Sequence, residues 1–204
     1  MNKLKCYTIA GIIFVLVTGS LAHFLYDWTG KNAITGLFTP VNESVWEHIK
    51  LLFFPMLLYS FFMIYKLKNE YPCIISSLCF GILAGAFCIP VLFYTYTFLL
   101  GKDIFILDIA VFILSTMIAF GLSYSLTLSC TLKPYTLLLC SLTAVLFACF
   151  VIFTSHPPNH KLFKDPSLHE TAGAVIRHPL SFQSQTPVIR CLRYYFSFYL
   201  EDTA

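Results

Sequence analysis

The side chains best suited to chemistry lie in one short polar segment, NESVWEH, at residues 42–48. Glu43 and Glu47 offer carboxylates that can act as general bases, and His48 offers an imidazole that can bind a metal ion. The apolar run IKLLFFPMLLYSFFMIY follows directly. Chemistry at this position would therefore take place where a membrane-length segment begins.

Other ionisable side chains interrupt or end apolar runs elsewhere in the chain. His23 and Asp27 are four residues apart, so they share one face of a helix. Asp108 is flanked on both sides by aliphatic residues, and an ionisable residue inside a membrane segment is by default a functional candidate. The predicted binding site comprises His23, Asp27, Asn42, Glu43, Ser44, Glu47, His48 and Asp108.

A metal site is one form that this chemistry could take. The segment HPPNH places His156 and His160 at H-x-x-x-H spacing, but its two prolines exclude a regular helix, so both imidazoles could bind one ion only from a turn. The candidate zinc ligands are His48, His156 and His160. Glu43 or Glu47 would then be the catalytic base acting on a metal-bound water.

A structural role explains part of the same segment. Ser44 and Glu47 fit the S-x-x-E capping box, which satisfies free amides at the start of a helix. Asn42 is an alternative N-cap residue, and Glu47 could pair with Lys50 one turn later. These roles leave His48 and Asp108 unexplained.

Composition predicts the class of protein. Of the 204 residues, 58% are hydrophobic and 11% are charged, and the mean hydropathy is +0.77. Soluble domains carry about 25% charged residues, so this chain is predicted to be an all-α, polytopic membrane bundle with lipids as its surroundings. A net charge of +3 is too small to favour nucleic-acid binding. Most of the eight cysteines lie in apolar runs, and we expect neither a disulfide nor a cysteine metal site.

Five runs are long and apolar enough to cross a membrane. The lysines at positions 3, 5, 66, 68 and 133 all fall on one side of a five-span bundle, which the positive-inside rule makes cytoplasmic, together with the N-terminus. The second run has only fifteen uncharged residues, Leu51 to Tyr65, or about 22 Å of helix. Glu47, His48 and Lys50 are therefore expected at membrane depth with protein partners. The predicted spans are 6–26, 45–65, 73–100, 104–128 and 135–153.

Three stretches together, HFLYDW, LFTPVNESVWEHIKLLFFP and PP…LFKDP, resemble a family of small, uncharacterised multi-pass membrane proteins of Gram-positive bacteria, classed as a domain of unknown function. The resemblance covers about residues 8–166. It implies a bacterial plasma-membrane protein and implies no activity.

The pattern Glu43-Ser44-x-Trp46-x-His48 also resembles the first motif of the alkaline ceramidase and progestin-receptor-like superfamily of membrane zinc hydrolases. That resemblance implies His48 as a zinc ligand and Ser44 as a nearby polar group. The chain departs from the superfamily in having five predicted spans instead of seven.

Three hypotheses follow for function. The first is a plasma-membrane protein whose outward polar cluster binds a ligand, an ion or a proton. The second is a metal-dependent membrane hydrolase acting on a lipid or small amphiphile, and the third is an accessory subunit of a transporter. Residues 1–166 form the predicted membrane domain, and residues 167–204 form a more polar tail that we expect to be poorly ordered.

Overall fold

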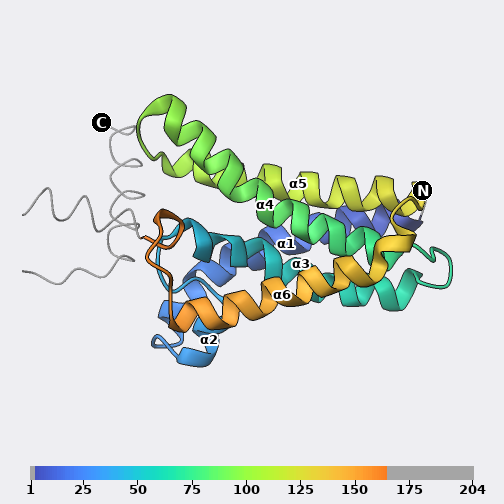
Figure 1. The fold of residues 1–204 in the computed structure, drawn as a ribbon, viewed down its shortest axis with the longest axis horizontal. Helices are drawn as coiled ribbons and strands as arrows, with labels where there is room; N and C mark the ends of the chain where they lie inside the picture. The colour runs from blue at the N-terminus through green and yellow to red at the C-terminus, as the bar shows by residue number, and fades with distance from the viewer. Residues whose placement is uncertain (1–2, 165–204) are drawn as a thin grey trace, which may run out of the picture. The chain divides into compact units, whose positions relative to one another are not determined.

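The computed structural model describes residues 3–164, and within that range every regular element is helical (Figure 1). The predicted polar tail, residues 167–204, lies outside the described residues. In chain order the helices are α1 (Lys3–Trp28), α2 (Ala33–Phe38), α3 (Val45–Leu67), α4 (Ile74–Leu100), α5 (Phe105–Ser129), the 3-10 turn η1 (Lys133–Tyr135), α6 (Thr136–Ser155) and the 3-10 turn η2 (Lys161–Phe163).

Five of the helical segments in this range are long and apolar enough to cross a membrane. They are α1, α3, α4, α5 and the segment Lys133–Ser155, which joins η1 to α6. The predicted all-α membrane bundle with five spans is therefore confirmed. The observed helices extend beyond several of the predicted spans because a helix continues through polar residues at its ends, such as Lys3 at the start of α1.

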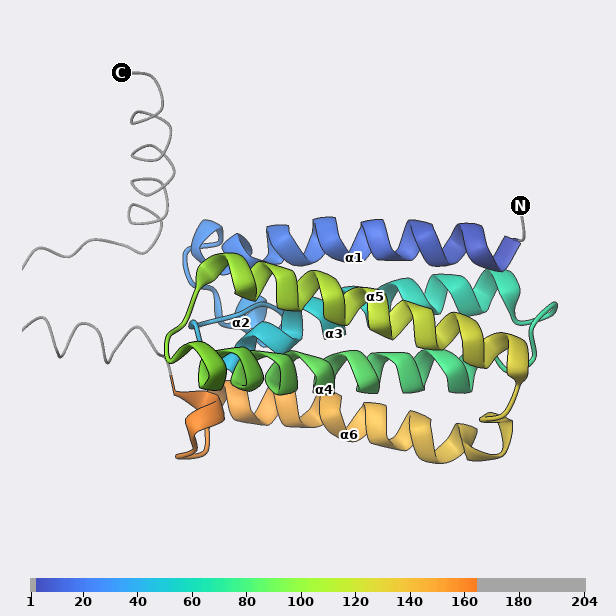
Figure 2. The ribbon, with the colours of Figure 1, turned by 90° about the horizontal axis from the view of Figure 1, so that it is seen from above.

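The long helices run side by side and alternate in direction, as the two ribbon views agree (Figure 2). One end of the bundle, here called the lysine end, carries Lys3, Lys66, Lys68 and Lys133. The opposite end, here called the polar end, contains the C-terminus of α1, the short helix α2 and the start of α3. Residues predicted to form a site thus gather at one end because of the antiparallel topology.

Helix α3 forms the centre of the bundle. It packs against α1 and α4, and its residues Leu52, Phe53 and Met56 are completely buried. The opposite face of α3 leaves Leu58 and Phe61 exposed, and α1 and α6 leave Ile13 and Leu137 exposed, as expected of surfaces that face lipid. The buried residues Leu52, Phe53 and Met56 mark the inward face of α3.

The closest helix pair is α4 with α5, and it depends on glycine. A Cβ atom added to Gly81 would lie 1.9 Å from the Ser123 hydroxyl oxygen and 2.6 Å from the Ala119 carbonyl oxygen. No larger residue fits that position without moving α5. Small residues commonly allow this close approach of backbones in membrane bundles.

Within the described residues the structure contains one disulfide, although none was expected from the sequence. Cys73, directly before α4, and Cys130, directly after α5, form a disulfide with their Cα atoms 5.3 Å apart. The prediction that no disulfide would form is wrong for this pair. The two residues are 57 positions apart, and only the antiparallel packing of α4 on α5 brings them together.

Candidate metal site at the polar end

The site begins with the turn that starts α3. Ser44 is the N-cap residue, and its hydroxyl accepts a hydrogen bond from the Glu47 amide over 3.4 Å. The Asn42 side chain accepts a bond from the Ser44 amide, at 3.0 Å. The predicted capping box is therefore half present, because the amide that Glu47 would have capped is bonded to Asn42 instead.

Glu47 points into the protein and binds Lys50. Its Oε2 atom lies 2.6 Å from the Lys50 ammonium, and the two side chains are only 3% and 0% exposed. The same oxygen accepts a bond from the Val41 amide at 3.0 Å. The predicted pairing of Glu47 with Lys50 is confirmed, and it engages the Glu47 carboxylate inside the protein.

Lys50 is fully satisfied in this buried position. Its ammonium donates to Glu47, to the Gly36 carbonyl of α2 at 3.1 Å and to the Thr154 hydroxyl of α6 at 2.7 Å. An ammonium has three hydrogens, so the number of acceptors matches the number of donors. Lys50 therefore ties α2, α3 and α6 together, and this role is structural.

His48 points to a different environment although it follows Glu47 directly. Its Nδ1 atom lies 2.9 Å from the Ser44 carbonyl oxygen, one turn earlier. A carbonyl can only accept, so in the neutral imidazole this contact places the ring hydrogen on Nδ1 and leaves the lone pair on Nε2. That lone pair lies 3.4 Å from Oε2 of Glu43.

His23 of α1 completes the group. Its Nε2 atom lies 3.9 Å from the same Glu43 oxygen, and the His23 and His48 rings are 5.4 Å apart between centroids. His23, Glu43 and His48 each offer one ligand atom, and these three atoms lie within 4.8 Å of one another. No other group of three possible metal ligands gathers in this way among residues 3–164.

Two of the three separations approach those of a metal site. Ligand atoms about 2.0–2.2 Å from a tetrahedral ion lie roughly 3.4 Å from each other. The His48–Glu43 separation of 3.4 Å matches this value, and the His23–Glu43 separation of 3.9 Å is slightly longer. His48 also has the backbone partner on its second nitrogen that metal-binding histidines usually have.

Further carboxylates make the surroundings of this group negative. Asp27 interacts electrostatically with His23, and Asp108 does so with His48. The single hydrogen of the Tyr96 hydroxyl is shared between the carboxylates of Asp108 and Asp103, the latter at 2.6 Å. The nearest lysine in α3, Lys50, is neutralised by Glu47. The site therefore favours a cation over an anion.

The structure divides the residues predicted from sequence. His23, Glu43 and His48 come together, Asp27 and Asp108 interact with the two histidines electrostatically, and Asn42, Ser44 and Glu47 organise the start of α3. His156 and His160 are exposed near the end of α6, and neither joins the His48 group. Instead, His160 accepts a hydrogen bond from the Leu162 amide.

Comparison with protein families supports the class of protein. A family model described as a family of unknown function, DUF6512, matches residues 1–171. The chain belongs to the DUF6512 family. It is thus a member of a family without an assigned activity, and its five long apolar helices mark it as a multi-pass membrane protein. No curated protein and no solved structure matched the chain.

Proposed function

We propose that this DUF6512 protein binds a divalent transition-metal ion at the polar end, through Nε2 of His23, the carboxylate of Glu43 and Nε2 of His48. The observation that carries the proposal is the convergence of two imidazole nitrogens and one carboxylate from α1, the α2–α3 connection and α3. A lone pair on Nε2 of His48 and the Glu43 carboxylate repel one another, and a bound cation turns that repulsion into attraction.

The donor atoms indicate the kind of ion. Imidazole nitrogen suits zinc, copper, iron and nickel, whereas calcium and magnesium prefer six or more oxygen ligands. Two histidines and one carboxylate satisfy three positions of a tetrahedral ion and leave the fourth for water or another ligand. Zinc is therefore the first ion to test.

Binding is better supported than hydrolysis. A zinc hydrolase needs a general base in addition to its metal ligands. Glu47 is buried against Lys50 and Glu43 is itself a ligand, so the two bases predicted from sequence are both committed. We therefore propose a metal-binding membrane protein and assign no reaction to it.

The location proposed for the site follows from the lysines. Lys3, Lys5, Lys66, Lys68 and Lys133 lie at the opposite end of the bundle, and the exposed lysines 31, 102, 161 and 164 lie at the polar end. Lys3 and Lys5 precede the first span, which usually dominates orientation, so the positive-inside rule favours a cytoplasmic lysine end. In a bacterial plasma membrane, as the family resemblance suggests, His23, Glu43 and His48 would then face the outside of the cell. The site would take its ion from that compartment.

Metal titration of the purified protein tests the proposal. The full chain in detergent, stripped with a chelator, is dialysed against Zn²⁺ and its metal content is measured. We expect one ion per chain for the native protein and loss of that ion in His23→Ala and His48→Ala. The matched controls, His156→Ala and His160→Ala, should keep it. Zinc content that is unchanged by His48→Ala would refute the site.

A further inference from the structure

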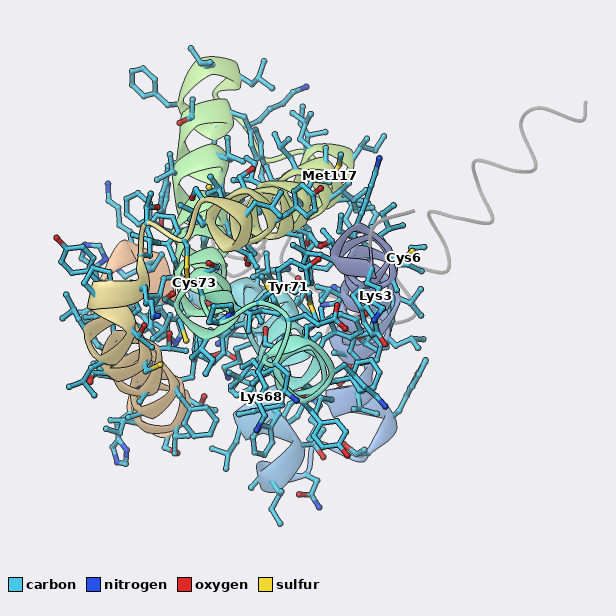
Figure 3. All side chains as sticks on the ribbon, turned by 90° about the vertical axis from the view of Figure 1, so that its right-hand side faces the viewer. Lys3, Cys6, Lys68, Tyr71, Cys73 and Met117 are labelled. Atoms are coloured by element: carbon cyan, nitrogen blue, oxygen red, sulfur yellow. A yellow bond between two sulfur atoms is a disulfide. The ribbon has the colours of Figure 1, made fainter. Side chains whose placement is uncertain are left out.

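The lysine end holds a second cluster of reactive groups, which the proposed metal site does not involve. The disulfide between Cys73 and Cys130 joins the α3–α4 connection to the end of α5. Figure 3 looks onto this end and shows the sulfur–sulfur bond beside Cys73, with Lys3 and Lys68 on the same face. A redox-active bond thus lies at the same end as Lys3 and Lys5, which precede the first span.

If the disulfide were permanent, it and the lysines at the same end of the bundle would indicate different compartments. Lys3 and Lys5 directly precede the first span, and lysines at that position indicate the cytoplasmic side of a membrane. The cytoplasm keeps thiols reduced, and disulfides that form there are usually transient and redox-sensing. Both observations hold together only when the bond forms and breaks.

We propose that Cys73 and Cys130 form a reversible, redox-controlled clasp on the cytoplasmic side of the bundle. In the reduced state the pair carries two thiols, and in the oxidised state it carries the bond seen in the structure. The assignment rests on the position of the two cysteines and of the lysines. It is independent of metal binding at the other end.

The chemistry is thiol–disulfide exchange with a low-molecular-weight disulfide, RSSR. Cys130 is half-buried, whereas Cys73 is only 1% exposed, so Cys130 is the sulfur that small molecules reach. The Cys130 thiolate attacks RSSR and releases one RS⁻ as a mixed disulfide forms. The Cys73 thiolate then displaces the second RS⁻ and closes the bond. Two protein thiols and one RSSR thus yield one protein disulfide and two RSH.

Reduction follows the reverse path. A thiol RSH, as its thiolate, attacks Cys130 and releases Cys73 as a thiolate. A second RSH releases Cys130 and leaves RSSR. Each direction transfers two electrons and two protons between the protein and the thiol pool, with no other reactant.

The clasp would act on the α4–α5 pair. At the polar end this pair is closed by residues 101–104 and by the bond from Tyr96 to Asp103. At the lysine end the structure closes it through Cys73 and Cys130. Oxidation therefore fixes both ends of the pair, and reduction frees one of them.

A second cysteine pair must be removed so that it does not compete with Cys73 and Cys130. Cys79 and Cys140 lie within α4 and α6, with their sulfur atoms 3.5 Å apart. They are inside predicted spans, where aqueous thiols have poor access. Removing them with Cys79→Ser and Cys140→Ser leaves the clasp as the pair to be followed.

The experiment measures the redox state of the full chain in cells, in the Cys79→Ser/Cys140→Ser background. Samples are quenched in acid, denatured, alkylated and analysed by mass spectrometry. We expect Cys73 and Cys130 to be alkylated in growing cells. Diamide treatment should lower the alkylated fraction at least tenfold, and dithiothreitol should restore it. Cys130→Ser should leave Cys73 alkylated throughout.

Two results would overturn the clasp. A pair that stays oxidised in untreated cells is a permanent disulfide, and a pair that stays alkylated after diamide never forms the bond. Neither result depends on zinc, so the clasp and the metal site fail separately.

Discussion

The ammonium of Lys50 lies 2.6 Å from the carboxylate of Glu47, and both side chains are buried at the polar end of the bundle. Removing one partner of such a pair leaves an uncompensated buried charge. We expect Lys50→Met to lower the free energy of unfolding by about 3–5 kcal/mol. Unfolding of the detergent-solubilised protein by sodium dodecyl sulfate, followed by circular dichroism, measures the change.

The double variant Glu47→Gln/Lys50→Met provides the control for that experiment. It removes both charges, so it should recover a large part of the lost stability. If the double variant were as unstable as Lys50→Met, the loss would come from packing or from the bonds to Gly36 and Thr154, and the ion pair would not be the cause.

Close packing of α4 on α5 gives a second prediction. Gly81→Ala would place a methyl group 1.9 Å from the Ser123 hydroxyl and 2.6 Å from the Ala119 carbonyl. We expect a loss of about 1–3 kcal/mol in the free energy of unfolding, because overpacking forces the helices apart. Gly121→Ala, where a Cβ atom meets nothing within 4 Å, should change stability little or raise it slightly. Equal effects of the two substitutions would show that the contact does not matter.

The orientation of the bundle can be tested with single cysteines. Lys102, in the exposed turn between α4 and α5, lies at the polar end, and Lys133 lies at the lysine end. In intact cells a membrane-impermeant maleimide should label Lys102→Cys and spare Lys133→Cys, each in a background without the native cysteines. The reverse pattern would place the metal site inside the cell and the Cys73–Cys130 bond outside, and it would contradict the redox clasp.

Asp108 should tune the affinity of the metal site without being one of its three ligands. It interacts electrostatically with His48, so Asp108→Asn removes a nearby negative charge. We expect zinc binding to weaken roughly three- to tenfold, with a smaller difference at high salt. Isothermal titration calorimetry at two salt concentrations measures this. A complete loss of binding would instead make Asp108 a ligand.

The helices were predictable because the bilayer imposes a length. Uninterrupted apolar runs of about 20 residues admit few alternatives, so each predicted span overlaps an observed helix. The short helix Ala33–Phe38 was missed because it has only six residues and depends on capping by Asn32. The disulfide was missed because Cys73 and Cys130 are 57 residues apart and carry no local motif.

The site was predictable only in part. Glu47 and His48 are adjacent on a helix and must point in directions about 100° apart, so one site could not use both equally. Which one faces the protein interior depends on the rotation of α3, and tertiary packing sets that rotation. Trp46, for example, packs against Phe150 of α6 and Phe163 of η2. Sequence patterns do not encode these long-range contacts.

The most direct test of the metal site is the X-ray absorption spectrum of the zinc-loaded full chain. For the native protein we expect nitrogen and oxygen ligands at about 2.0–2.2 Å from zinc, with outer-shell scattering from two imidazoles. Any zinc that the His23→Ala variant retains should show scattering from only one imidazole. A sulfur shell at about 2.3 Å would place the ion on cysteines instead. That spectrum would contradict binding by His23, Glu43 and His48.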